Sequence, residues 1–166
     1  MNSNKKKILT SACYAVLVIL AGWAVLVLLQ LLRWTDLIDI NIGLGSQIGR
    51  LAWAADLKAL TIQRVEIIGY MASSLVLIAL AFILVVNCMK GIKSKRLFSH
   101  KSTITLWAIT CVSFFFELFS SNLSILFGSR QISFGSNLVV TPLILLLFTL
   151  LYDTAVSIAA ENELTI

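Results

Sequence analysis

The stretch ILTSACYAVLVILAGWAVLVLLQLL, residues 8–32, contains no charged side chain, and Lys5, Lys6 and Lys7 directly precede it. At about 1.5 Å of rise per helical residue the stretch reaches roughly 37 Å, which exceeds the roughly 30 Å thickness of the hydrocarbon core of a bilayer. A cleaved signal peptide has a shorter apolar region of about 7 to 15 residues, so we favour an uncleaved anchor. The stretch therefore predicts a first membrane span.

The composition of the whole chain indicates a membrane protein as well. Of its 166 residues 59% are hydrophobic and 13% are charged, whereas a typical soluble domain has about 25% charged residues. The formal charge of +5 arises from short basic clusters beside apolar runs, not from one basic amphipathic face as in many nucleic-acid-binding proteins. We therefore expect the lipid bilayer as the principal partner and no direct binding of nucleic acid.

Three further apolar runs predict membrane spans at about residues 67–89, 102–127 and 137–160. We expect a single all-α membrane domain over residues 1–166, an integral membrane four-helix bundle with a structured outer loop between its first two spans. The third run contains a polar step at Ser120, Ser121 and Asn122. That step allows an alternative in which a helix is followed by a re-entrant piece ending at residues 124–127.

The distribution of basic residues predicts the orientation. The amino terminus and the segment 90–101 hold eight of the thirteen Lys and Arg residues, whereas four basic and four acidic residues balance in the segment 33–66. Because loops rich in Lys and Arg stay in the cytoplasm, we expect both termini to be cytoplasmic. The segment 33–66 then becomes an outer loop.

The outer loop is unusually apolar, and we expect a short helix over residues 46–60 with Ser46 as its N-cap. This loop is either a cap that recognises a ligand or partner, or an interfacial helix that lies on the lipid headgroups. Trp34 and Trp53 suit the second interpretation, which we favour, because tryptophan is enriched at that depth. Trp34, Arg50 and Trp53 are the candidate interface residues of this loop.

Two acids fall inside predicted spans and are the candidate functional residues of the membrane interior, namely Glu117 and Asp153. An acid at the centre of a span costs roughly 2.5 to 3.5 kcal/mol on insertion scales, so it usually faces the protein interior or water. Glu117 is either a protonatable relay or ligand site, or an interfacial residue at the end of the third span. For Asp153 we favour an inward-facing structural acid paired with a neighbouring hydroxyl or lysine over a transport site, and Thr149, one helical turn away, is a candidate hydrogen-bond partner.

The sequence contains no enzyme signature. Cys13, Cys88 and Cys111 lie inside predicted spans without any CxxC pair, and we expect them to be buried structural residues. His100 is the single histidine, which excludes a paired-histidine haem site and a two-histidine zinc site within one chain. No nucleophile elbow, Walker A or dinucleotide-binding glycine pattern is present, so we expect neither catalysis nor a cofactor.

The tail ENELTI, residues 161–166, resembles the ending of a bacterial family of small four-span membrane proteins, the domain of unknown function 2975. The basic loop followed by Leu97, Phe98 and Ser99 is similar to that family too, as is the four-span layout of the whole chain. The chain departs from the family pattern after the Phe-Ser step. There it has His100, Lys101 and Ser102 where members tend to have acidic residues or asparagine.

The family has no established activity, but its members are often encoded beside a small helix-turn-helix regulator of the Cro/CI type. The resemblance therefore implies a regulatory or interaction component of the bacterial inner membrane. The candidate partner contacts lie in the basic loop and in the tail: Lys93, Lys95, Arg96, Glu161, Asn162 and Glu163.

Two alternatives from other functional classes remain beside that interpretation. One is an oligomeric small transporter or proton-linked channel that uses Glu117 and Asp153, in which a homo-oligomer forms the path. The other is an immunity-type membrane protein that recognises a toxin through the outer loop.

Overall fold

The computed structural model describes residues 3–35, 51–94, 99–129 and 131–164, and every regular element in these ranges is helical. The elements are α1 (Ser3–Trp34), α2 (Leu57–Ser94), α3 (His100–Ser120), the 3-10 helix η2 (Leu123–Phe127) and α4 (Asn137–Leu164). Four helical segments are long and apolar enough to cross a membrane: Asn4–Trp34, Leu57–Ser94, His100–Phe127 and Asn137–Glu161. The predicted all-α four-helix membrane architecture is confirmed, and the chain is a multi-pass membrane protein.

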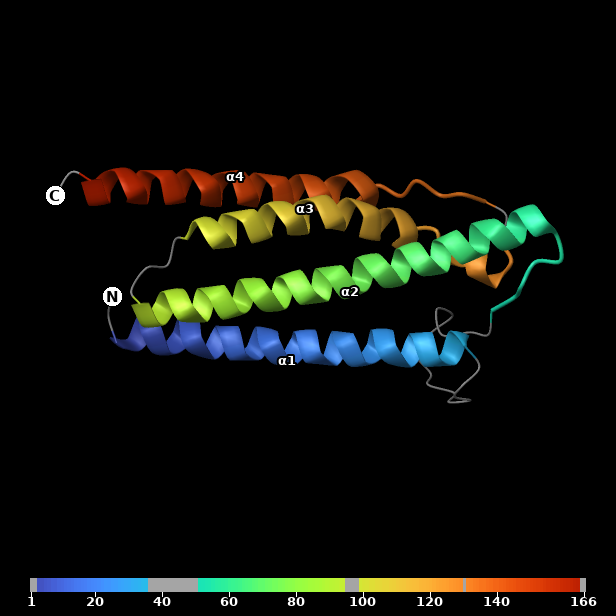
Figure 1. Ribbon diagram of the computed structural model, residues 1–166, viewed down its shortest axis with the longest axis horizontal. Coiled ribbons are helices and arrows are strands. Elements are labelled where there is room, and N and C mark those ends of the chain that lie inside the picture. The colour runs from blue at the N-terminus through green and yellow to red at the C-terminus, as the bar shows by residue number, and fades with distance from the viewer. Residues whose placement is uncertain (1–2, 36–50, 95–98, 130, 165–166) are drawn as a thin grey trace.

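The four long helices run alternately up and down and pack in chain order (Figure 1). The helix α1 packs on α2, α2 on α3, and α3 on α4, while η2 packs on α2. Both chain termini lie at one end of the molecule in Figure 1, which we call the proximal end. The opposite end, where α1 ends and α2 begins, is the distal end.

The first helical turns of α2 differ from the prediction. The helix begins at Leu57, ten residues before the expected position 67, and residues 51–56 are not helical. Asp56 explains the start, because its Oδ2 accepts a hydrogen bond from Ala59 N at 3.2 Å, as an N-cap does. The predicted helix over residues 46–60 is therefore wrong for residues 51–56. Residues 46–50 lie outside the described ranges.

The third span is interrupted where the polar step lies. The helix α3 begins after Ser99, whose Oγ accepts a hydrogen bond from Ser102 N at 3.2 Å, and it ends at Ser120. The separate 3-10 helix η2 follows and ends at Phe127, and the capping residue Gly128 has a φ of 94°, which suits glycine because it has no Cβ. The third span is therefore helical in two pieces, α3 and η2, with a break at the polar step, and both pieces lie within the candidate membrane segment His100–Phe127.

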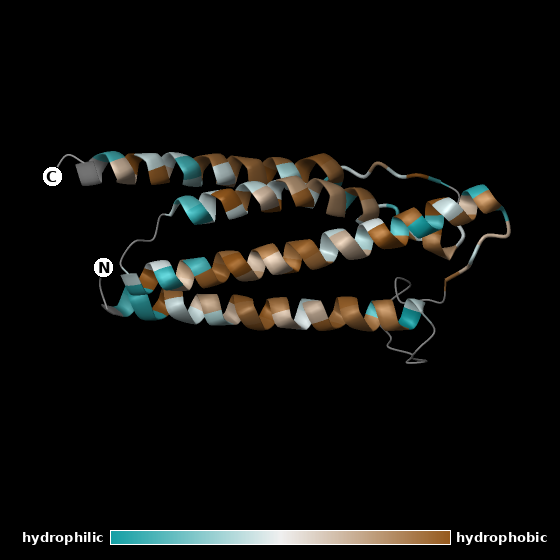
Figure 2. Cartoon of the chain, viewed as in Figure 1, coloured by the Kyte–Doolittle hydropathy of each residue, from teal (hydrophilic) through white to brown (hydrophobic). Residues whose placement is uncertain are grey.

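The surface of the helices is apolar along most of their length (Figure 2). On α4, for example, Leu147, Phe148 and Leu151 are exposed. Polar side chains such as Ser74, Ser102 and Thr149 lie buried between helices instead. This distribution suits a lipid environment, because lipid solvates apolar side chains but offers no hydrogen bonds to polar ones.

Candidate functional site

A junction at the distal end is built around the side chain of Gln63, which is only 4% exposed. Gln63 Nε2 donates to Ala52 O at 2.8 Å and to Ile125 O at 3.1 Å. Its Oε1 accepts a hydrogen bond from Ala54 N at 3.0 Å. One amide therefore joins α2 to the segment before it and to η2, which is 62 residues away in sequence.

A backbone hydrogen bond closes the same junction. Ala52 N donates to Leu126 O at 3.1 Å, and the Leu126 side chain is fully buried. We call residues 51–54, Gln63 and η2 together the distal cap. These hydrogen bonds join carbonyl and amide groups of three separate segments. The distal cap therefore keeps its shape only while all three segments remain in contact.

Glu66 lies one turn further along α2, on the same face as Gln63. Its side chain is 7% exposed, and its Oε1 has no hydrogen-bond partner among the described residues. Trp34 on α1 is 5% exposed, and its Nε1 is also without a partner in the described ranges. A buried polar group costs free energy unless it is hydrogen-bonded, and a carboxylate costs most. These two groups are therefore the best candidates for binding a proton or a small polar ligand.

Aromatic side chains surround this part of α2 and connect three helices. The Tyr70 ring centroid lies 5.9 Å from that of Trp34 on α1 and 5.8 Å from that of Phe116 on α3. The Tyr70 hydroxyl donates to Gln30 Oε1 at 3.3 Å. Phe116 also contacts Trp23 edge to face, with the centroids 5.9 Å apart. Tyr70 thus anchors the distal halves of α1, α2 and α3 to one another.

The buried polar residues of α2 recur every three or four positions and form one stripe that faces α1 and α3. We call this stripe the polar face of α2, and it consists of Gln63, Glu66, Tyr70, Ser73 and Ser74. Ser74 Oγ donates to Tyr70 O at 2.7 Å and Ser73 Oγ donates to Gly69 O at 2.7 Å. The serine hydroxyls are therefore satisfied within the helix, and Glu66 is the member left with an unpaired oxygen.

The candidate acids from the sequence occupy other places. Glu117 and Asp153 are both half-buried. Glu117 lies in the last turn of α3, where its carbonyl oxygen accepts a hydrogen bond from Ser121 N at 3.0 Å. This position at the helix end favours the interfacial interpretation of Glu117.

The hydrogen bond predicted between Asp153 and Thr149 is wrong. Thr149 Oγ1 is paired with Thr110 Oγ1 of α3 at 3.0 Å and with Leu145 O at 2.8 Å. The threonine is only 1% exposed, and its hydroxyl links α4 to α3. The Thr149 hydroxyl is therefore hydrogen-bonded to the neighbouring helix α3 and to the preceding turn of α4, and not to Asp153.

The remaining candidate residues are dispersed. Trp34 is buried in the bundle and does not form a surface for a partner, whereas Trp53 is 52% exposed. Lys93 at the end of α2 and Glu161 near the end of α4 are exposed. The other predicted contact residues lie outside the described ranges or have side chains outside them: Arg50, Lys95, Arg96, Asn162 and Glu163.

The three cysteines are free thiols with different surroundings. Cys13 is buried and Cys88 is half-buried, but Cys111 is exposed. The expectation that all three are buried is therefore wrong for Cys111, which lies on the outward face of α3. Among the described residues no group of three or more His, Cys, Asp or Glu side chains is placed to hold a metal ion.

Sequence reasoning missed Gln63 and Glu66 because both were assigned to a loop. The signal that identifies them is the spacing of polar residues 63, 66, 70, 73 and 74, which lie on one side of a helix. Comparison of this chain with models of protein families, with curated proteins and with solved structures finds no match. The family resemblance of the tail and the basic loop stays a prediction.

Proposed function

We propose that this chain is a regulatory component of the bacterial inner membrane, with both termini in the cytoplasm, and that it has no catalytic activity. In this proposal the distal cap lies on the outer side, and the proximal end contacts a small helix-turn-helix regulator. The observation that carries the proposal is the continuity of α2. One uninterrupted helix, Leu57–Ser94, leads from the distal cap to the exposed lysines of the proximal end.

The length of α2 supports this role. Its 38 residues extend about 57 Å at helical rise, so both ends project beyond a hydrocarbon core of roughly 30 Å. The helix packs on α1 along one side and on α3 along another. A change in the distal cap therefore displaces or tilts a rigid element whose other end lies in the cytoplasm, and helix shifts of this kind are a common switching device.

The proximal end of α2 offers a basic surface to a partner. Lys90 and Lys93 are exposed, and α2 contains no acidic residue after Glu66. The excess of basic residues at this end supports the cytoplasmic orientation. An acidic surface on the regulator would complement these lysines.

The test uses the full-length protein co-expressed with a small helix-turn-helix regulator of the Cro/CI type. Replacement of both proximal lysines, K90Q with K93Q, is expected to lower recovery of the regulator on the purified membrane protein about tenfold, because two charge contacts are lost. The matched control is K58Q, which removes an exposed lysine at the distal end. Recovery of the regulator that is the same for all three proteins would contradict the proposal.

A second function is favoured by one specific observation, the buried oxygen of Glu66 that has no hydrogen-bond partner in the described part of the chain. Intramembrane acids that face the protein interior often carry protons in pumps and transporters. In this second function Glu66 takes the role in proton-linked transport that sequence analysis assigned to Glu117 and Asp153. The immunity-type alternative depends on the outer loop, of which residues 36–50 lie outside the described residues.

This second function predicts that Glu66→Gln abolishes proton uptake into vesicles that contain the purified protein. The glutamine keeps the shape of the side chain but cannot exchange a proton at neutral pH. Glu117→Gln and Asp153→Asn are the comparison variants, and they are expected to retain most of the uptake. The measurement is the fluorescence of a pH indicator enclosed in the vesicles, and undiminished uptake by the Glu66 variant would exclude this function.

A further inference from the structure

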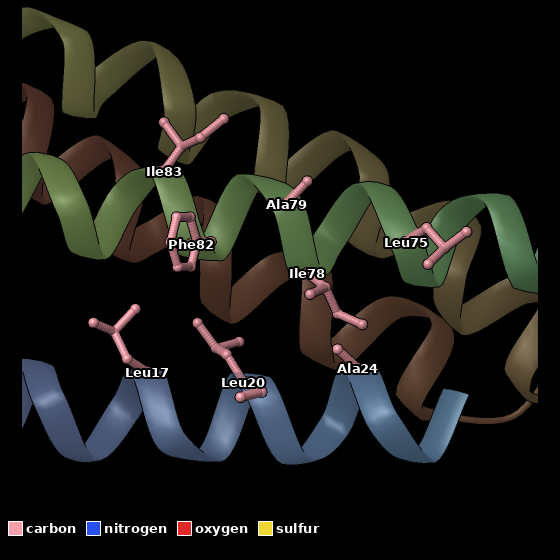
Figure 3. A pocket seen from close by; sticks show the side chains of 9 residues that line it. Leu17, Leu20, Ala24, Leu75, Ile78, Ala79, Phe82 and Ile83 are labelled. Atoms are coloured by element: carbon pink, nitrogen blue, oxygen red, sulfur yellow. The ribbon is translucent and has the colours of Figure 1, made fainter. Parts of the chain in front are cut away.

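An apolar groove of about 430 Å³ lies between α1 and α2 (Figure 3). From α1, side chains project toward α2, and Ile78 and Phe82 project from α2 toward α1. Alanines contribute to the hollow, since a short side chain fills little of the space between two helices. The side chains that shape the groove are Leu17, Leu20, Ala24, Ile78, Ala79 and Phe82.

The lining of the groove limits what can occupy it. All nine lining residues are apolar, so their side chains offer no hydrogen bond to a ligand inside the groove. An enclosed apolar cavity of about 150 Å³ already holds a benzene molecule, and this groove is larger and partly open. A groove of this larger size suits a flexible hydrocarbon chain.

Positive charge gathers at one end of the same helix pair. Lys5, Lys6 and Lys7 are exposed in the first turns of α1, and Lys90 and Lys93 are exposed in the last turns of α2. Because the two helices are antiparallel neighbours, these lysines lie together at the proximal end (Figure 2). The helix α1 contains no acidic residue, so nothing on it neutralises this charge.

The spacing between the lysines and the groove matches the dimensions of one lipid leaflet. Leu17 follows Lys7 by ten residues, which is about 15 Å along the helix. Half of a bilayer with its headgroups measures roughly 20 Å. A hydrocarbon chain whose headgroup lies at the level of the lysines therefore reaches the groove from within the same leaflet.

We propose that the pair α1 and α2 binds an anionic phospholipid, with its phosphate on the proximal lysines and one acyl chain in the groove. Charge complementarity favours this occupant over an apolar helix of a second copy, because such a helix offers no anionic group to the lysines. Basic sites between membrane helices recognise anionic headgroups by the same electrostatics. This inference goes beyond the proposed regulatory function and does not depend on it.

The test is native mass spectrometry of the full-length protein in detergent with added lipid. The two lipids are a phosphatidylglycerol and a phosphatidylcholine with identical acyl chains, and the protein is expected to retain the phosphatidylglycerol preferentially. The pair K6Q with K93Q is expected to lower that binding by about fivefold per lysine, which corresponds to about 1 kcal/mol for each basic residue near the surface. The control K58Q, at the distal end, is expected to leave the retention of both lipids unchanged.

Two groove variants test the position of the acyl chain. Ala24→Trp fills the groove from α1 and Ala79→Phe fills it from α2, and each is expected to lower the retention of both lipids at least threefold. Val18→Phe is the control, because Val18 is exposed on α1 and is not among the lining residues. Circular dichroism checks that every variant keeps its helix content.

Three results would overturn the proposal. The first is equal retention of the two lipids by the unaltered protein. The second is unchanged lipid retention in both groove variants or in the double lysine variant. The third is a change in oligomer mass of the groove variants while their lipid retention stays the same. That result would show that the groove is a contact between two copies of the chain.

Discussion

Replacement of Gln63 with glutamate is expected to open the distal cap and to lower the free energy of unfolding by about 3 to 5 kcal/mol. In the native protein Gln63 Nε2 donates to two carbonyl oxygens, those of Ala52 and Ile125. Glutamate has an oxygen at the position of that nitrogen, so both carbonyls lose their donor. When ionised, the carboxylate also places a buried negative charge against two oxygens, and no described neighbour compensates it.

The measurement is unfolding of the protein in mixed detergent micelles by increasing SDS, followed by the helical circular dichroism signal. Gln131→Glu is the matched control, because it makes the same chemical change at an exposed position. We expect that control to shift the unfolding midpoint very little. Equal shifts for the two variants would show that the hydrogen bonds of Gln63 do not hold the distal cap together.

The four spans could be predicted because their signal is local. In residues 8–32 the absence of charge and the lysines in front are enough to predict a helix that crosses a membrane. In the structure the helix is only a few residues longer than this stretch, with the bounds Ser3–Trp34. The break after Ser120 was likewise foreseeable as an alternative, since three consecutive polar residues interrupt the apolar run there.

The distal cap could not be predicted, because its contacts join residues far apart in sequence. The sequence pattern assigns residues 57–66 to a loop, since Lys58, Arg64 and Glu66 interrupt the apolar residues there. The helix forms there nevertheless, with the charged Lys58 and Arg64 exposed and Gln63 buried against η2. Only the folded arrangement brings the carbonyl groups of residues 52 and 125 to one amide.

The partner of Thr149 illustrates the same limit at shorter range. A sequence argument can pair Thr149 only with residues one turn away on its own helix, and Asp153 is the polar residue in that position. In the structure the hydroxyl is bonded to Leu145 O and to Thr110 of the adjacent helix. Polar groups in membrane helices are satisfied by neighbouring helices, and the register between two helices is not encoded in either one alone.

The close approach of α2 and α3 at Gly69 leads to the second large effect. The ring of Phe119 lies against Gly69, and a Cβ at that position would collide with it. Phe119 in turn packs against the buried core cluster that includes Tyr70 and Leu126, so the ring has little freedom to move away. Small residues permit such close helix packing in membranes.

Gly69→Leu is therefore expected to force α2 and α3 apart and to lower the free energy of unfolding by about 3 kcal/mol, the upper part of the range for overpacked sites. The control Gly22→Leu adds the same side chain to α1, where nothing lies within 4 Å of a Cβ. We expect that control to be neutral or slightly stabilising, because leucine favours a helix more than glycine does. Both are measured as shifts of the SDS unfolding midpoint.

A second substitution separates this steric cause from other effects of a leucine in α2. Phe119→Ala removes the obstructing ring, so adding it to the Gly69→Leu protein is expected to recover part of the lost stability. Phe119→Ala alone is expected to be destabilising, because it leaves a space beside Gly69. The two substitutions should therefore compensate each other in a double-mutant cycle. Strict additivity of their free energies would show that contact between residues 69 and 119 does not set the distance between α2 and α3.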